Sequence, residues 1–265
     1  MTLKLEGNNI LVDVPQVVCL PSLKTLQLLR VTYLNEDSLR LLLSSCPVLE
    51  DLCIKLERDD NKSVIVVNVP SLQRLTLLIG SGCSSDGYSI VSPCLKYLKI
   101  VDYRCMPSYL IEPMPKLEEA DIEVRKGIEK ILESITSVRR LSLRSWFSSA
   151  EESVYRAGIV FSQLEHLMLC IHSKYWSKLL IWLLRNSPKL RVLNVYVIRG
   201  SLEYDPVDWK NIESSIPECF LRSLETFEFE GMGTQEERDF WRIFFKHASC
   251  LKSTSINGHA TQFGV

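Results

Sequence analysis

One pattern of apolar and polar positions recurs along the chain. At residues 46–54 it reads Cys-Pro-Val-Leu-Glu-Asp-Leu-Cys-Ile, which abbreviates to Pro-x-Leu-x-x-Leu-x-Leu/Ile. The same phrase stands at residues 21–28, 70–77 and 188–195. Self-similarity at a short, nearly fixed period is the sequence signature of a repeat architecture.

Ten copies of the phrase align when its first leucine is taken as position zero. The zero positions are Leu23, Leu49, Leu72, Leu95, Leu117, Val138, Leu164, Leu190, Leu224 and Leu251. Successive copies are 26, 23, 23, 22, 21, 26, 26, 34 and 27 residues apart. Most of these intervals match the period of roughly 20–29 residues that leucine-rich repeats show.

The phrase itself predicts a short strand. Apolar positions +3 and +5 alternate with polar positions +2 and +4, a period of two that leaves one face of a strand buried. One copy cannot bury its apolar face alone, so the copies must stack and pair as a parallel sheet. We therefore expect an α/β leucine-rich-repeat solenoid, an arc with a parallel inner sheet and mixed helices and short strands outside.

Three segments between the copies have helical patterns. Residues 35–43 form an amphipathic helix that begins at Asn35, a residue favoured at helix N-termini, and residues 173–185 form a second. The third runs over residues 235–247, because Thr234 and Glu237 have the spacing of a capping box. Its wide aromatic stripe favours packing on the last strands as a cap, with a peptide-binding groove as the alternative.

The other connections differ from these helices. Residues 64–69 are almost all Val and Ile, which predicts a strand on the outer face, and residues 81–89 are rich in Ser and Gly, which predicts a loop. The long interval before the ninth copy holds residues 200–216 and is expected to interrupt the stacking. Residues 1–20 are apolar and form either a partial capping repeat or the continuation of a longer parent chain.

Composition and charge narrow the class of partner. The chain has 265 residues, 46% of them hydrophobic, and a net charge of −1 from 31 basic and 32 acidic side chains. This balance gives no electrostatic argument for nucleic acid or for an anionic membrane. The densest apolar stretch, residues 179–184, is far shorter than the roughly 20 residues that span a bilayer, and residues 1–10 do not resemble a signal peptide.

The nine cysteines include no C-x-x-C pair, and several occupy apolar positions of the phrase. Reduced, buried thiols in an intracellular compartment, cytoplasm or nucleus, are therefore expected. No histidine lies at metal-ligand spacing to another histidine or to a cysteine pair, and no phosphate-binding or nucleophile-elbow motif occurs. We expect no enzyme activity, no metal and no cofactor.

Two stretches carry a resemblance to a known family. Residues 44–52, Ser-Ser-Cys-Pro-Val-Leu-Glu-Asp-Leu, resemble the repeats of plant F-box/leucine-rich-repeat proteins. Residues 209–231, with Ile-Pro-Glu-Cys-Phe-Leu at 216–221, and residues 234–252 resemble the FBD domain that ends many such proteins. The resemblance implies a leucine-rich-repeat region over 1–208, of about eight repeats, followed by FBD-like repeats and a capping helix over 209–265.

The resemblance also implies a function. In that family an N-terminal F-box docks the ubiquitin ligase adaptor and the repeats bind the target, but no F-box pattern precedes Pro21. The chain is thus expected to be a non-enzymatic protein-interaction module that resembles the substrate-recognition part of the ligase, with the adaptor as partner only if an F-box is supplied elsewhere. The alternatives are a small-ligand receptor and a truncated product without independent function.

The concave face of the sheet is the expected binding surface, because there the side chains at +2, +4 and +6 vary between copies. Charged groups concentrate on the fifth to seventh strands. The candidate protein-binding residues are Glu119, Asp121, Glu123, Arg140, Ser142, Arg144, His166 and Met168. Adjacent strands lie about 4.8 Å apart. Glu119–Arg140 and Glu123–Arg144 pairs are therefore expected, either as a solvated ion ladder or as a charged recognition patch.

Overall fold

The computed structural model divides the chain into two compact units, unit 1 (Met1–Ser137) and unit 2 (Val138–Val265). It describes residues 1–8, 10–15, 17–35, 37–57, 64–83, 87–104, 108–145, 158–172, 176–198 and 215–258. The expected interruption of the stacking at 200–216 therefore lies almost wholly outside the described residues. The boundary predicted at residue 208 stays a prediction.

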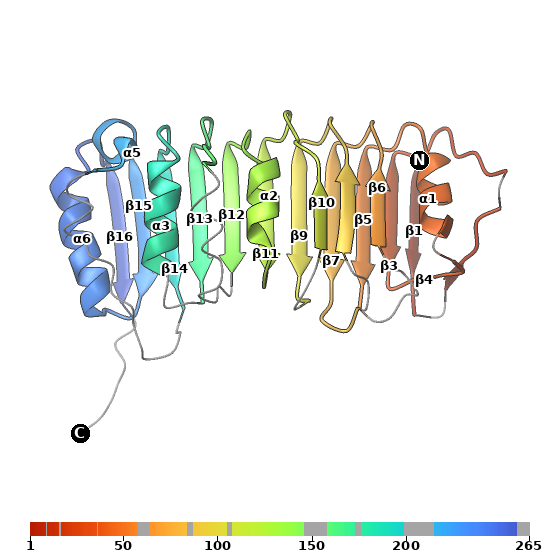
Figure 1. The fold of residues 1–265 in the computed structure, drawn as a ribbon, viewed down its shortest axis with the longest axis horizontal. Coiled ribbons are helices and arrows are strands. Elements are labelled where there is room, and N and C mark those ends of the chain that lie inside the picture. Colours follow the sequence, from red (N-terminus) through yellow and green to blue (C-terminus); the bar gives the residue numbers. More distant parts are fainter. Residues whose placement is uncertain are drawn as a thin grey trace, which may run out of the picture. The chain divides into compact units, whose positions relative to one another are not determined.

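Unit 1 is built on six parallel strands that pair in chain order (Figure 1). They are β1 (Thr2–Glu6), β3 (Thr25–Leu29), β5 (Asp51–Leu56), β7 (Arg74–Ile79), β9 (Tyr97–Asp102) and β11 (Glu119–Val124). The register aligns the same phrase position in each copy, so that Leu26, Leu52, Leu75 and Leu98 are successive partners. The repeat register predicted from the sequence is confirmed, and β1 adds a strand ahead of the first aligned copy.

The return segments of unit 1 are short strands and helices. They are β2 (Leu11–Val12), β4 (Thr32–Tyr33), α1 (Asp37–Ser44), β6 (Val64–Asn68), β8 (Gly87–Val91), β10 (Ser108–Ile111) and α2 (Ile128–Ser134). Strands β6, β8 and β10 form a second, three-stranded parallel sheet, and Figure 1 shows β6 and β10 lying over one face of the long strands. Strand β6 confirms the outer strand predicted at 64–69.

The sequence prediction of a loop over residues 81–89 is wrong at its end, because β8 begins at Gly87. Tyr88 and Ile90 alternate with half-exposed residues and are fully buried, which is the pattern of a strand. Only glycine fits at position 87, because a Cβ there would overlap the carbonyl oxygen of Ser108 on the neighbouring strand β10. Helix α2 was not predicted either; its seven residues are too few for a clear helical period.

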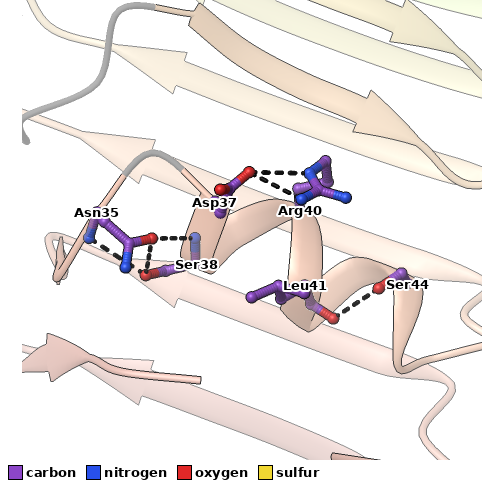
Figure 2. A network of polar contacts seen from close by, with 6 residues as sticks. All are labelled: Asn35, Asp37, Ser38, Arg40, Leu41 and Ser44. Atoms are coloured by element: carbon purple, nitrogen blue, oxygen red, sulfur yellow. Dashed lines mark hydrogen bonds and ion pairs between the residues drawn. The ribbon is translucent and has the colours of Figure 1, made fainter. Parts of the chain in front are cut away.

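The α1 helix shows the Asn cap that the sequence predicts. The Asn35 side chain accepts hydrogen bonds from the backbone N–H and the hydroxyl of Ser38, both at 3.0 Å (Figure 2). Asp37 and Arg40 pair on the exposed side of the same helix at 2.8 Å. The bond from the Ser38 N–H satisfies one of the backbone donors that the first turn of a helix leaves without intrahelical partners.

Unit 2 repeats the parallel pairing with five strands. They are β12 (Arg140–Ser145), β13 (His166–Ile171), β14 (Val192–Val197), β15 (Thr226–Gly231) and β16 (Ser253–Gly258). The described return segments are helices: α3 (Trp176–Arg185), α5 (Glu218–Arg222) and α6 (Gln235–His247). Helix α6 has the bounds predicted from the sequence, and the Thr234–Glu237 capping box is present.

The aromatic stripe of α6 packs inward, as the capping interpretation predicts. Phe240 and Phe244 are buried, and the Phe244 ring centroid lies 4.1 Å from that of Phe227 on β15. Trp176 of α3 joins the same cluster, 5.9 Å from the Phe240 ring. These large side chains are buried, so this part of the stripe belongs to the core.

A set of backbone hydrogen bonds repeats in both units. The N–H of the zero residue closes a turn onto the carbonyl three residues earlier, as in Leu72 to Val69 and Leu190 to Ser187. Serines just before position zero bond to the preceding copy: Ser71 donates to the carbonyl of Leu49 at 2.8 Å. The phrase thus fixes a turn, a buried strand and a link to its neighbour.

Candidate functional site

In each unit one face of the long-strand sheet lies under the return segments, and the other, here called the open face, carries half-exposed side chains. On unit 2 the open face holds positions +2, +4 and +6 of successive copies, which the register places in rows across the strands. The residues of β12 to β15 on this face are Arg140, Ser142, Arg144, His166, Met168, Cys170, Val192, Asn194, Tyr196, Thr226, Glu228 and Glu230.

One row of the unit 2 open face forms a pocket. Arg144, Cys170, Tyr196 and Glu230 are successive partners across β12, β13, β14 and β15. They line a hollow of about 590 Å³, here called the β12–β15 pocket. Ligand sites in proteins commonly measure roughly 300–1,000 Å³, so the pocket has room for a side chain or a small molecule.

The remaining lining of the β12–β15 pocket is apolar. Met168 precedes the row on β13, and Val197 is the last residue of β14. Ile198 and Met232 line the pocket just beyond the carboxyl ends of β14 and β15. Ile198 is exposed, at 43% of its surface. Methionine side chains are flexible and polarisable, so a pocket lined by Met168 and Met232 adapts to apolar and aromatic groups of different shape.

The β15 side of this face is acidic. Glu228 and Glu230 both project from β15 onto the open face, opposite Asn194 and Tyr196. Partial burial, together with the charge of these two carboxylates, raises the pKa of Tyr196. The phenol therefore stays protonated at neutral pH, and Glu228 is its hydrogen-bond partner.

The β12 side is basic. Arg140 and Arg144 lie on the exposed face of β12, four residues apart with Ser142 between them on that face. His166 on β13 is the register partner of Arg140. Arginine is positively charged at every physiological pH and binds carboxylates through a planar fork of donors. Across the described part of unit 2, the open face thus carries positive charge on β12 and negative charge on β15.

The acidic candidates of unit 1 have partners within their own unit. Asp121 pairs with Lys99 on β9 at 2.6 Å, and Glu123 accepts a hydrogen bond from the Tyr103 hydroxyl at 2.8 Å. Glu119 lies beside Tyr97 in the register of β9 and β11. Of these three acidic residues, Asp121 is thus balanced by a charge of opposite sign on the neighbouring strand.

The structure therefore distributes the predicted site residues over both units. Arg144 and Met168 line the β12–β15 pocket, whereas Arg140, Ser142 and His166 lie nearer the start of the strands on the same face. The expected Glu119–Arg140 and Glu123–Arg144 pairs would join the two units and stay predictions. Sequence reasoning did not select Cys170, Tyr196, Glu230 and Met232 as candidates. The first three occupy position +6, so the register alone could have identified them.

A second hollow, of about 640 Å³, lies before the first residues of β14 and β15. Four of its charged groups form ion pairs: Glu225 binds Arg191 at 2.8 Å and also Lys252 at 3.0 Å, and Arg222 binds Glu218 at 2.8 Å. The bonds from Lys252 and Arg191 hold the pKa of Glu225 below its ordinary value.

The described residues contain no group of three or more His, Cys, Asp or Glu side chains that could hold a metal ion. Burial raises the pKa of the Cys219 thiol to about 12, so this buried cysteine is not an activated nucleophile. Within the same part of the chain, no helix has the length and apolar character needed to cross a membrane.

Parallel strands at leucine-rich spacing, joined by strands and helices and ending in an aromatic-capped repeat, define an α/β repeat protein. The Leucine Rich Repeat family matches residues 22–47 and the FBD family matches residues 212–256. The chain belongs to the plant F-box/FBD/leucine-rich-repeat family.

Three Arabidopsis thaliana relatives illustrate the similarity. The FBD-associated F-box protein At5g60610 is 55% identical over 97% of this chain and 68% of its own length. The putative FBD-associated F-box protein At5g56700 is 62% identical over 97% and 65%, and the putative F-box/FBD/LRR-repeat protein At4g00315 is 46% identical over 96% and 62%. The chain thus spans about two thirds of these relatives. The comparison with solved structures gave no match.

Proposed function

We propose that this chain is a non-enzymatic recognition module that binds a target protein through the open face of unit 2. The observation that carries the proposal is the β12–β15 pocket, an apolar hollow between Arg144 and Glu230 on a sheet face that no described return segment covers. Apolar pockets with a few placed polar groups are the usual form of a binding site.

The family supplies the context for this recognition. Relatives that cover the chain almost end to end are named as F-box proteins, and the family places target-binding repeats in ubiquitin ligases. We infer that the repeats present a target for ubiquitination, in the cytoplasm or nucleus, when an F-box is joined to them. The proposed organisation is one solenoid arc, with leucine-rich repeats over 1–208 and FBD-like repeats over 209–265.

The experiment that tests this proposal is affinity capture from plant extract with matched variants. The tagged chain is compared with Met168→Glu, which puts a charge into the β12–β15 pocket, and with Lys189→Glu, which changes an exposed lysine that contacts Gln163 ahead of β14. A protein counts as a target only if Met168→Glu lowers its recovery about tenfold while Lys189→Glu does not, as expected when one pocket dominates binding. Equal recovery with all three chains would contradict the proposal.

A second assay concerns the ligase adaptor. The purified adaptor should not bind this chain alone, because the repeats are proposed to bind the target and the F-box to bind the adaptor. Robust direct binding, measured by pull-down with the two purified proteins, would show that the repeats have taken over the docking role.

The volume of the β12–β15 pocket favours one alternative, a small-ligand receptor, because about 590 Å³ suits a molecule of that class. A ligand at 100 times its Kd stabilises the folded state by about 2.7 kcal/mol, which a thermal-shift screen detects. The alternative requires a stabilising compound whose effect disappears in Met168→Glu. A screen without such a compound favours the target-protein proposal.

A further inference from the structure

The second sheet of unit 1, formed by β6, β8 and β10, has two different faces. Ile65, Tyr88 and Ile90 lie on the face that covers the long strands, and all three side chains are buried. The residues between them point to the opposite side, because successive residues of a strand alternate. This opposite side, here called the outer face, is exposed to solvent on β6 and β10.

Apolar side chains adjoin one another on the outer face. Val66, Ser89 and Leu110 are successive register partners across β6, β8 and β10, with Val64 and Val91 in the rows on either side. Leu110 is 69% exposed, Val64 42% and Val66 38%. These five residues, here called the outer patch, include no charged group.

An apolar outer face is unusual for a parallel sheet that stands in water. Parallel sheets are mostly covered on both faces, and their strands then consist of continuous apolar runs. Residues 64–67, Val-Ile-Val-Val, are such a run, although only Ile65 and Val67 are buried. Exposed apolar side chains that adjoin one another mark interaction sites more often than scattered ones do. The sequence of β6 is thus suited to a strand with a partner on its outer face.

Both edges of this sheet already have helical neighbours. Helix α1 packs against β6 and helix α2 packs against β10, and Figure 1 shows the two helices on either side of these strands. A partner that added a strand to the sheet would need a free edge. The arrangement therefore favours a partner that lies on the outer face.

The size of the outer face decides between a second copy of the chain and a single helix. Three strands about 4.8 Å apart, with five residues of about 3.3 Å each, make a face of about 14 by 16 Å, or roughly 230 Å². A stable protein dimer needs far more, roughly 800 Å² from each partner. A helix with its side chains is about 10–12 Å across and rises about 1.5 Å per residue, so about three turns of one helix cover the face.

Exposed ion pairs stand on both flanking helices. Asp37 pairs with Arg40 at 2.8 Å on α1 (Figure 2), and Lys130 pairs with Glu133 at 3.4 Å on α2. Charges paired at such short distances in water attract a charged partner only weakly. Recognition at the outer patch therefore depends on apolar contact, which a helix provides through a stripe of apolar residues at i, i+3 or i+4, and i+7.

We infer that the outer patch binds an amphipathic helix of another protein, about three turns long, whose apolar stripe lies on Val64, Val66 and Leu110. The inference goes beyond the proposed function, because the outer patch belongs to the return segments of unit 1 and the β12–β15 pocket to the open face of unit 2. The bound helix would complete the covering of β6, β8 and β10. The chain thus has a second binding surface, selective for apolar helices.

The test is selection from a phage library in which one exposed helix face of a stable three-helix bundle is randomised. A folded bundle is the probe because an isolated helix of three turns is only marginally stable in water. Selection on the purified chain should enrich bundles with apolar residues at i, i+3 or i+4, and i+7. A selected bundle should bind Leu110→Ser about tenfold more weakly and Val66→Thr about threefold more weakly, by biolayer interferometry, because each change removes apolar surface from the centre of the patch.

Two further variants serve as controls. Val160→Thr changes an apolar side chain of unit 2 that is 51% exposed, and Met168→Glu puts a charge into the β12–β15 pocket. Both should bind the selected bundle as tightly as the wild type. Leu110→Ser and Val66→Thr should unfold within about 2 °C of the wild type, because both side chains are exposed. If Leu110→Ser is less stable than this, Val66→Thr decides, since threonine keeps the shape of valine.

The inference is overturned if no bundle is enriched, or if the selected bundles bind both patch variants as tightly as the wild type. It is also overturned if light scattering shows a wild-type dimer that Leu110→Ser dissociates, because the outer patch would then bind a second copy of the chain. None of these results changes the dependence of target capture on Met168, so the inference and the proposed function can fail separately.

Discussion

The two units share one repeated phrase but differ in the segments that connect its copies. In unit 1 three consecutive copies return through the strands β6, β8 and β10, which pair as a second sheet. In unit 2 the regular elements of the described return segments are the helices α3, α5 and α6. Phe244 of α6 packs on Phe227 of β15, and Phe220 of α5 packs on Phe244. The buried strand positions therefore tolerate either kind of covering layer, provided that it presents an apolar face.

The open faces of the two units also differ, in how their charged side chains are distributed. On unit 1 opposite charges occupy neighbouring strands and pair, as Lys99 does with Asp121. On unit 2 the arginines of β12 and the glutamates of β15 lie three strand steps apart, with the β12–β15 pocket between them. On a shared scaffold, the solvent-side residues thus set the pattern of charge on each open face.

The largest expected loss of stability comes from the aromatic core of unit 2, which we compare with the aliphatic core of unit 1. Phe227→Ala should cost about 3–5 kcal/mol of unfolding free energy, because it removes a ring packed against Phe244. Leu75→Ala, at the same phrase position in unit 1, should cost less, about 2–4 kcal/mol. Urea denaturation followed by circular dichroism measures both. An equal or smaller loss for Phe227→Ala would mean that the rings collapse into the space.

A buried ion pair distinguishes unit 1. Asp102 is fully buried and holds Arg104, which is 5% exposed, at 2.7 Å. Burial alone would lower the pKa of Arg104, but the hydrogen bonds and charge of Asp102 reverse this and raise it. Asp102→Ala should therefore cost about 3–5 kcal/mol of unfolding free energy, because it removes the carboxylate that balances the buried charge of Arg104.

The control for Asp102 is the partly exposed pair of the same unit. Lys99→Ala, which loses the contact to Asp121, should cost about 0–1 kcal/mol because water screens that pair. Replacing both buried partners, by Asp102→Leu with Arg104→Met, should recover most of the stability lost in Asp102→Ala. Similar losses for Asp102→Ala and Lys99→Ala would show that water reaches the buried pair.

The helix caps of the two units should have similar strength. Asn35→Ala at α1 and Thr234→Ala at α6 should each cost about 1 kcal/mol, because each leaves a first-turn N–H without its side-chain acceptor. Thermal denaturation of both variants measures the effect, and Thr234→Ser, which keeps the acceptor oxygen, is the matched control. A much larger loss at Thr234 would mean that the cap also holds α6 on its aromatic core.

The smallest expected effect concerns the open face itself. Arg144→Ala should change stability by less than about 0.5 kcal/mol, because its side chain is exposed on β12. The same variant should still weaken capture of a target that depends on Met168, because Arg144 lines the same pocket. A large loss of stability would mean that Arg144 is part of the structure of unit 2 and not of its binding surface.

The repeat register could be predicted because it rests on a local rule. Alternation at +3 and +5 assigns Leu52, Leu75 and Leu98 to the buried face, and each is fully buried. Helix α6 could be predicted for the same reason, because its capping box and its aromatic stripe lie within a short stretch of sequence. By contrast, β8 could not be predicted, because its glycine and serine residues are typical of a loop. It forms a strand through pairing with β6 and β10, segments about 20 residues away.

The sequence by itself determined the phrase, its period, the buried positions and the family, because each follows from residues close together in the chain. The shared position +6 of Arg144, Cys170, Tyr196 and Glu230 implies one row, and the tertiary structure decided that this row lines a pocket. Arg144 and Glu230 are far apart in sequence, and only the stacking of four copies at a fixed strand spacing brings them onto one surface.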